Sequence, residues 1–279
     1  MKNYLLDKII RLFVWCLLRF SRQTRRAFAH WLATQIFNRS NKTRLRACDN
    51  IAKALPEMDE EQIKELALTS YKNIVFGLFE CFWLPELDKK TKIVCDEQTL
   101  ELLHHNNGVS IATMHMSCYE LAPFAVQKLL GAVTTLSKIP PFVRSAKHCY
   151  QQANITVIDK NQPHALLSLM TAARKKQAIC LHADHYANEL PISFFSRKTS
   201  APSGAAMLSA YAKTPLLICY CTLKENGHYQ VVIETLRSTP VDYNKAAIAQ
   251  ATQALYSRFE QIIRQHPEQW YWSYNRWRK

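Results

Sequence analysis

Hydrophobic residues recur at helical spacing through the first 80 positions, and no strand pattern occurs among them. The spacing predicts helices over residues 4–20, 25–36, 44–55 and 58–80. Pro56 ends the third of these helices, and Asp59 is placed to cap the start of the fourth. We therefore expect a helical segment over residues 1–80.

From about residue 92 the pattern changes to short apolar strands that alternate with helices. Strands are expected over residues 92–95, 109–114, 132–137, 155–158, 178–181, 216–222 and 228–234. Helices are expected over residues 97–105, 121–130, 141–151, 163–175, 202–212 and 244–266. Asn226-Gly227 precedes the last strand and is a strong hairpin signal, which adds an antiparallel edge. The alternation predicts an α/β fold over residues 81–279, with a mixed, mostly parallel sheet flanked by helices.

The helix predicted over residues 4–20 has a strongly basic side. Its longest uncharged run, residues 12–18, is shorter than the roughly 20 residues of a bilayer span, and no signal-peptide cleavage site follows. On a helical wheel the charged residues fall within an arc of about 120°: Asp7, Lys8, Arg11, Arg19, Arg22, Arg25 and Arg26. We expect an amphipathic helix that lies in a membrane interface. Packing of its apolar side on the protein itself, or a tilted span with snorkelling ends, would explain the same pattern.

The amino-acid composition favours some classes of binding partner over others. The chain of 279 residues has a net charge of +14 and a pI near 9.4, which favours an anionic partner: nucleic acid, lipid headgroups or an acidic carrier. Its nine Cys residues include no C-x-x-C pair and mostly lie within apolar patterns, which indicates reduced thiols in a cytosol-facing protein. The sequence contains no P-loop, no G-x-G-x-x-G and no G-x-S-x-G, which argues against a nucleotide-cradling loop and a serine hydrolase.

The main candidate for chemistry is the stretch from residue 107 to 120, where a buried strand leads into a helix. On one regular helix His115 and Glu120 would point roughly 140° apart, so they meet only if His115 precedes the helix and Glu120 lies in its first turn. Glu120 could then orient His115 while His115 takes a proton from a hydroxyl group. Ser117 and Glu120 also match a capping box, so Glu120 could cap the helix instead, or do both.

The stretch from His115 to Glu120 resembles the H-x4-E motif of the bacterial lipid A late acyltransferases, within the wider H-x4-D/E acyltransferase superfamily. Further segments resemble that family in the same order: Arg46, Asn50 and Leu55-Pro56-Glu57, then Ala183-Asp184-His185, Ser193-Phe194-Phe195-Ser196, Thr199 to Gly204, and Pro267-Glu268-Gln269-Trp270 with Arg276-Trp277. The chain departs from the family at Cys118-Tyr119, where Asn-Trp is usual, and at Ser196, where Gly is usual.

The resemblance implies transfer of a fatty acyl group from a thioester, acyl carrier protein or coenzyme A, to a hydroxyl of a lipid A precursor or a related lipid. In that scheme His115 is the general base and Glu120 orients it, with no metal, no cofactor beyond the acyl donor and no acyl-enzyme. The implied partners are acyl carrier protein, a membrane lipid acceptor and an anionic membrane surface, and nucleic acid is not among them. The implied location is the cytoplasmic face of a bacterial inner membrane.

Five residues are candidates for substrate binding: Lys138, Arg144, Asp184, Arg197 and Gly204. The family often has a basic residue after the second strand, for which Lys138 is the best match and Arg144 the next. Asp184 could hold a cationic side chain or the acceptor, or cap loop N–H groups. Arg197 and Arg144, with neighbouring lysines, could bind phosphate or form a solvated face. Gly204 could allow close backbone approach at a helix start, or simple packing.

Several alternatives remain. His182, Asp184 and His185 can ligate metals, but the spacing H-x-D-H matches no zinc signature, so no metal site is expected. The aromatic residues between positions 270 and 277 could lie at a membrane interface or pack on the domain. The alternative functions are a non-catalytic membrane-surface protein and a basic nucleic-acid-binding protein. The second leaves the ordered motifs unexplained, and no nucleic-acid-binding motif is visible.

Overall fold

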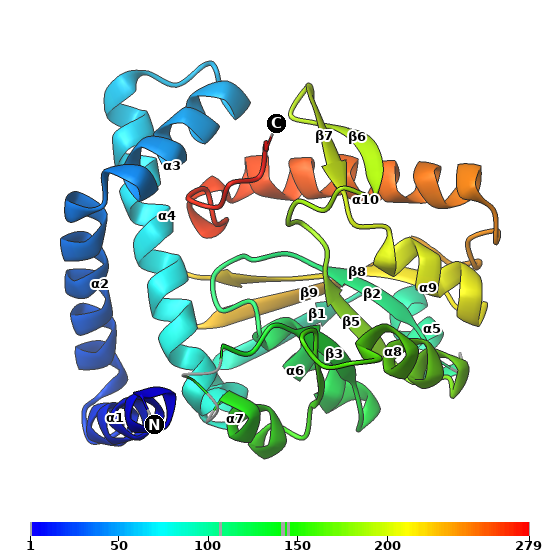
Figure 1. Ribbon diagram of the computed structural model, residues 1–279, viewed down its shortest axis with the longest axis horizontal. Coiled ribbons are helices and arrows are strands. Elements are labelled where there is room, and N and C mark those ends of the chain that lie inside the picture. Colours follow the sequence, from blue (N-terminus) through cyan, green and yellow to red (C-terminus); the bar gives the residue numbers. More distant parts are fainter. Residues whose placement is uncertain (1, 106–107, 141–142, 144–145, 279) are drawn as a thin grey trace.

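The computed structural model describes residues 2–278 except 106–107, 141–142 and 144–145. Its N-terminal part consists of helices α1 (Lys2–Leu17), α2 (Arg22–Arg39), α3 (Asn41–Ala54) and α4 (Glu60–Glu80). Asp59 caps α4 through a capping box with Gln62, and Ser21 and Ser40 cap α2 and α3. The cap at Asp59 confirms the predicted start of this helix. α2 and α3 pack on α4, which stands beside the sheet (Figure 1).

A seven-stranded sheet forms the centre of the molecule, in the order β1-β9-β8-β2-β5-β3-β4. Its strands are β1 (Thr91–Cys95), β2 (Ser110–Thr113), β3 (Thr134–Ser137), β4 (Thr156–Asp159), β5 (Ile179–His182), β8 (Leu216–Leu223) and β9 (Tyr229–Arg237). All neighbouring pairs are parallel except β8 and β9, which form the predicted hairpin. The α/β prediction is therefore confirmed. The hairpin was wrongly expected to form the edge, because β1 pairs with β9 on its outer side.

Helices cover both faces of the sheet. They are α5 (Glu97–His105), α6 (Leu121–Leu130), α7 (Ala146–Gln152), α8 (Ala165–Arg174), α9 (Gly204–Ala212) and α10 (Lys245–Gln265). α8, α9 and α10 pack on one face, while α6 and α7 lie on the other (Figure 1). Successive β2 residues show the division, since Ile111 belongs to the core below α6 and Ala112 to the core below α10.

A second hairpin and a 3-10 segment after α4 were not predicted. A second hairpin joins β6 (Leu190–Phe194) to β7 (Arg197–Ala201), and a 3-10 segment, η1 (Cys81–Lys90), follows α4. The hairpin turns at Phe195 and Ser196, which both have positive φ, and this pair lacks the Asn-Gly signal of a tight turn. In η1 the kink at Trp83 and the internal Pro85 interrupt the helical spacing. The helix expected from residue 163 begins instead at Ala165, after Pro163.

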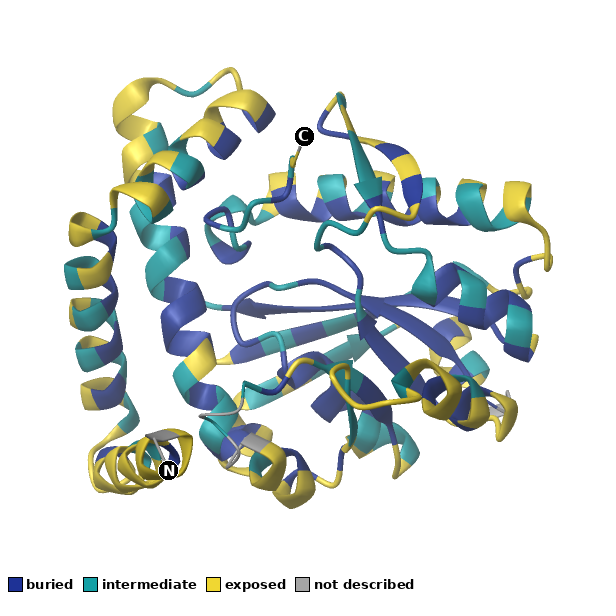
Figure 2. Ribbon diagram, viewed as in Figure 1, coloured by how far each residue is buried: buried dark blue, intermediate teal, exposed yellow. Residues whose placement is uncertain are grey.

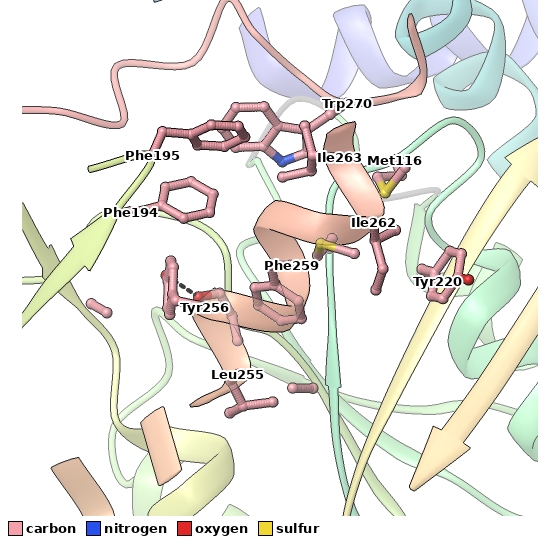
Figure 3. Packing of buried hydrophobic residues seen from close by; sticks show 14 of the residues in the cluster. Met116, Phe194, Phe195, Tyr220, Leu255, Tyr256, Phe259, Ile262, Ile263 and Trp270 are labelled. Atoms are coloured by element: carbon pink, nitrogen blue, oxygen red, sulfur yellow. Dashed lines mark hydrogen bonds between the residues drawn. The ribbon is translucent and has the colours of Figure 1, made fainter. Parts of the chain in front are cut away.

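The C-terminal tail is packed on the domain. It forms a short 3-10 turn, η2 (Pro267–Gln269), and then an irregular segment whose Trp270 and Trp272 are buried. Trp270 lies against Phe194 and Phe195 of the second hairpin, above the apolar residues of α10 (Figure 3). For these two indole rings the structure supports packing and not exposure at a membrane interface.

Among the described helices and strands, α1 has the most exposed large apolar side chains. Figure 2 shows it as mostly exposed at the foot of α2 and α4. Its exposed apolar residues are Tyr4, Leu5, Leu6, Ile9, Leu12, Phe13 and Trp15, while Phe13 also contacts Phe28 and Phe79. The basic arc expected from the sequence is split, because α1 ends at Leu17 and Arg22 pairs with the buried Glu80. Among the described residues no helix has the length and hydropathy needed to cross a membrane.

Candidate active site

His115 lies just beyond the carboxyl end of β2, in a loop held on two sides. Its carbonyl accepts a hydrogen bond from the Tyr271 N–H, and the Ser117 N–H donates to the carbonyl of Gln269. On the other side, Gly77 of α4 approaches so closely that a Cβ there would overlap the Ser117 carbonyl. The left-handed φ of 50° at Ser117 turns the chain toward α6. α4 and the C-terminal tail thus fix the position of His115.

The register of the parallel strands brings His115 beside Asp184. Thr113 of β2 pairs with His182 of β5, and His115 and Asp184 each lie two residues further on. The His115 Nδ1 and Asp184 Oδ1 atoms are 2.7 Å apart. Asp184 Oδ2 accepts hydrogen bonds from the His115 N–H at 3.0 Å and from the Trp270 indole at 2.8 Å. Asp184 therefore holds both the backbone and the ring of His115.

The Asp184 carboxylate is ionised although it is almost fully buried. Burial acts to raise the pKa of the Asp184 carboxyl, but its interaction with His115 and the hydrogen bond from Trp270 bring it well below its usual range. A buried carboxylate on Nδ1 leaves Nε2 of His115 as the nitrogen that can take a proton. Such a pair can activate a hydroxyl group as a nucleophile.

Glu120 lies at the start of α6 but does not cap it. Glu120 occupies the N-cap position, but its side chain makes no capping hydrogen bond, and Ser117 Oγ has no hydrogen-bond partner among the described residues. The capping-box alternative is therefore wrong. Glu120 Oε1 accepts a hydrogen bond from the Tyr150 hydroxyl at 2.6 Å and lies 3.6 Å from His182 Nε2. Between the described atoms of His115 and Glu120 no hydrogen bond forms, and Asp184 takes the orienting position at Nδ1.

Three imidazole rings gather at this point. His185 stacks face to face on His115, with ring centroids 3.7 Å apart, and its other face stacks on Tyr274 at 3.7 Å. Burial, together with the nearby charge of His115, lowers the pKa of His185 to about 3, so His185 is neutral near pH 7. His182 lies at the flank of His115, at a centroid distance of 4.8 Å.

This cluster is poorly suited to a metal ion. Potential ligand atoms of His115, Asp184 and His185 lie within 4.8 Å of one another. However, both Asp184 oxygens already accept hydrogen bonds, and the His115 and His185 rings are parallel to within 1°. An ion placed between two stacked imidazoles cannot lie in the plane of both rings, as imidazole ligation requires. A metal would have to displace the His115–Asp184 hydrogen bond and spread the stack.

An apolar cavity of about 480 Å³ opens beside Glu120. It is lined by Leu78, Phe79, Cys81, Phe82, Leu84, Tyr119, Glu120, Ser137, Lys138, Ile139, Pro140, Val143, Cys149 and Tyr150. Tyr119 connects this cavity to His115, because it is among the lining residues and its ring centroid lies 4.7 Å from that of His115. The site thus contains a carboxylate–imidazole pair next to an apolar cavity whose lining includes a few polar groups, such as Glu120 and Lys138.

The whole chain, residues 1–279, matches the family of bacterial lipid A biosynthesis acyltransferases. The protein belongs to this family. It is therefore an enzyme, an acyltransferase of lipid A biosynthesis, in agreement with the resemblance drawn from the ordered motifs. No curated protein matches the chain significantly.

The other residues expected at the site of this acyltransferase lie in different places. Lys138 is at the cavity, whereas Arg144 falls outside the described residues. Arg197 belongs to the β6–β7 hairpin, where its guanidinium lies over the Trp277 ring at 4.6 Å. Gly204 begins α9 as expected, and a Cβ there would come within 3.2 Å of Leu181, so its small size serves helix–sheet packing.

Several residues of the acyltransferase site carried no clear signal in the sequence. Tyr150 and Thr113 are ordinary core residues by pattern, and only the fold brings them to Glu120 and His182. Trp270 belongs to a motif of the C-terminal tail, but its hydrogen bond to Asp184 spans 86 positions of the chain. Such partners depend on strand register and tail packing, which local patterns do not encode.

Proposed function

We propose that this acyltransferase moves a fatty acyl chain from a thioester, with acyl carrier protein as the donor, to a hydroxyl group of a lipid A precursor or a related lipid. The proposal rests on the His115–Asp184 pair and the apolar cavity near it. Tyr119 lies between them, since it lines the cavity and its ring is close to that of His115. Family membership supplies the reaction class, and the geometry supplies the base.

In the proposed reaction His115 Nε2 takes the proton of the acceptor hydroxyl as its oxygen attacks the thioester carbonyl carbon. The tetrahedral intermediate then collapses, the carbon–sulfur bond breaks, and the thiolate takes the proton from the His115 imidazolium. Asp184 keeps the Nδ1 proton in place and stabilises the imidazolium while it exists. The scheme uses one proton and needs no acyl-enzyme.

We assign the acyl chain to the apolar cavity. Its walls come from α4, η1, the segment after β3 and α7, and they are mostly aliphatic or aromatic. Each methylene group moved from water into such a cavity contributes roughly 0.8 kcal/mol. Lys138 at the same cavity suits an anionic group of the donor or acceptor, such as a phosphate.

We further propose that α1 lies in an anionic membrane surface, at the cytoplasmic face of the inner membrane. Exposed apolar side chains and the cations Lys8, Arg11 and Arg19 occur together on this helix and just after it. Phe79 links the two features, because it lines the cavity and contacts Phe13 of α1. A lipid acceptor held at that surface would thus be close to the cavity.

The proposal is tested by lipid mass spectrometry of cells with and without the gene. We expect cells that lack the protein, or that carry only His115→Ala, to accumulate a lipid lighter by one acyl chain. His104→Ala is the matched control, because His104 is an exposed histidine on α5. With purified protein, acyl carrier protein thioester and lipid A precursor, wild type and His104→Ala should transfer the chain. Identical lipid profiles in all strains would refute the proposal.

A further inference from the structure

Glu120 belongs to the same short motif as His115, yet its carboxylate lies against a different imidazole. Glu120 Oε1 is 3.6 Å from Nε2 of His182, and the same oxygen accepts a hydrogen bond from the Tyr150 hydroxyl at 2.6 Å. Nδ1 of His115 is already bonded to Asp184. The site therefore contains two carboxylate–imidazole pairs side by side, Asp184 with His115 and Glu120 with His182.

One ring nitrogen of His182 is hydrogen-bonded, while Nε2 has no hydrogen-bond partner among the described residues but lies within ion-pair distance of Glu120. Nδ1 lies 2.6 Å from Thr113 Oγ1 on the neighbouring strand, and Nε2 faces Glu120. With the Thr113 hydroxyl donating to Nδ1, the His182 ring carries a proton on Nε2, on the side of the Glu120 carboxylate. The ring is further enclosed by Tyr119, which meets it edge-on at a centroid distance of 5.1 Å. A ring fixed in this way has one orientation with respect to His115.

We infer that His182 is a positioning residue through which Glu120 acts on His115. The inference rests on the proposed acyl transfer. The Glu120 carboxylate, 3.6 Å from His182 Nε2, favours a proton on that nitrogen, and the His182 ring lies at the flank of His115 at a centroid distance of 4.8 Å. The Glu120 carboxylate also places a negative charge near His115 in a buried site, where it stabilises the imidazolium that forms as the acceptor loses its proton.

A role of Glu120 by direct contact with His115 predicts a different outcome. If Glu120 acted directly, loss of Glu120 and loss of His182 would harm the reaction independently, and their effects on kcat would multiply. If Glu120 acts through His182, the first substitution already abolishes the effect of both residues on kcat. The second substitution then lowers kcat little further. A double-mutant cycle separates these two cases.

The experiment compares Glu120→Gln, His182→Phe and the double variant, with kcat and KM measured separately. We expect each single variant to lose roughly tenfold to a hundredfold in kcat with KM nearly unchanged, and the double variant to be within about twofold of the worse single one. His182→Gln, whose amide can still donate to Glu120, should recover part of the lost kcat. Multiplicative losses, or a His182→Phe variant with wild-type kcat, would overturn the inference. His104→Phe serves as the control for an exposed histidine.

A second measurement does not depend on turnover. The ring nitrogens of His182 can be followed by nitrogen-15 NMR in the wild type, Glu120→Gln and Thr113→Val. We expect both substitutions to move the His182 signals, because Glu120→Gln removes the negative charge beside Nε2 and Thr113→Val removes the hydroxyl at Nδ1. Unchanged His182 signals in Glu120→Gln would overturn the link even if His182→Phe failed to fold. If the wild type transferred no acyl chain, the proposed function would fail, while this measurement would still decide the contact.

Discussion

The side chain of Asp184 holds His115 at two points, the ring Nδ1 at 2.7 Å and the backbone N–H at 3.0 Å. The residues lie 69 positions apart and meet because β2 and β5 are parallel neighbours. The carboxylate expected in this role from the sequence was Glu120, five positions from His115. Spatial position, not closeness in the chain, therefore decides which acidic residue bonds to the His115 ring.

Replacement of Asp184 by Asn should reduce kcat by roughly a hundredfold to ten thousandfold, because an amide cannot stabilise the His115 imidazolium. The Trp270 hydrogen bond to the retained oxygen allows the fold to persist. Steady-state kinetics with the acyl donor would measure the loss. Asp88→Asn is the control, since Asp88 forms only a half-exposed ion pair with Lys128. Equal activity of Asp184→Asn and Asp88→Asn would show that Asp184 does not support the base.

His185 should make the folded protein sensitive to mild acid. Its pKa is lowered to about 3 in the fold, so between that value and its ordinary value of about 6.5 the unfolded chain binds a proton that the folded protein does not. The free energy of unfolding therefore falls as pH drops through this window, with a contribution of up to about 2 kcal/mol between pH 6.5 and 5.

His185→Gln removes this titration, so its thermal midpoint should fall less than that of the wild type between pH 7 and 5. Differential scanning calorimetry at a series of pH values would measure the difference. His104→Gln should follow the wild-type curve, because His104 is exposed. Parallel curves for His185→Gln and the wild type would contradict a neutral, buried His185.

The apolar cavity should set the preferred acyl length. Cys149→Phe adds a ring to its wall and reduces the space for the chain. We expect KM for long-chain donors to rise by about fourfold for each methylene that no longer fits, with shorter donors less affected. Competition between donors of different length would measure the change. Cys95→Phe on β1, outside the lining, is the matched control, and the same length preference in both variants would argue against this cavity.

Membrane binding by α1 should depend on its exposed leucines. Leu5 and Leu12 are 60% and 62% exposed, and together their insertion contributes roughly 3 kcal/mol or more. The variant with Leu5→Glu and Leu12→Glu should sediment far less with vesicles of mixed zwitterionic and anionic lipids. Leu167→Glu, also 62% exposed but on α8, should bind as the wild type does.

Binding to these vesicles should weaken at high salt, because cations of α1 contribute to it. The opposite result would be a wild-type protein that does not bind the vesicles but retards nucleic acid in a gel-shift assay, with a retardation that weakens as salt is raised. That outcome would favour a nucleic-acid-binding protein.

Helix and strand periodicity predicted most of the central sheet and its flanking helices, because these segments have a regular buried face. The β6–β7 hairpin was not predicted because it turns at Phe195 and Ser196, two residue types that seldom adopt positive φ. The capping role considered for Glu120 failed for a tertiary reason, since Tyr150 and His182 compete for its carboxylate. Local patterns describe what a segment prefers alone, while these partners come from other elements.

The hydrogen bond from Trp270 to Asp184 has a consequence for the timing of activity during synthesis. β2 and β5 leave the ribosome long before the tail does, so a nascent chain can pair these strands while Asp184 still lacks the indole N–H. The loop around His115 also lacks its hydrogen bonds to the Gln269 carbonyl and the Tyr271 N–H until the tail has been synthesised. The contacts that hold His115 and Asp184 are therefore completed last, and a chain that stops before residue 267 would carry the motif without them.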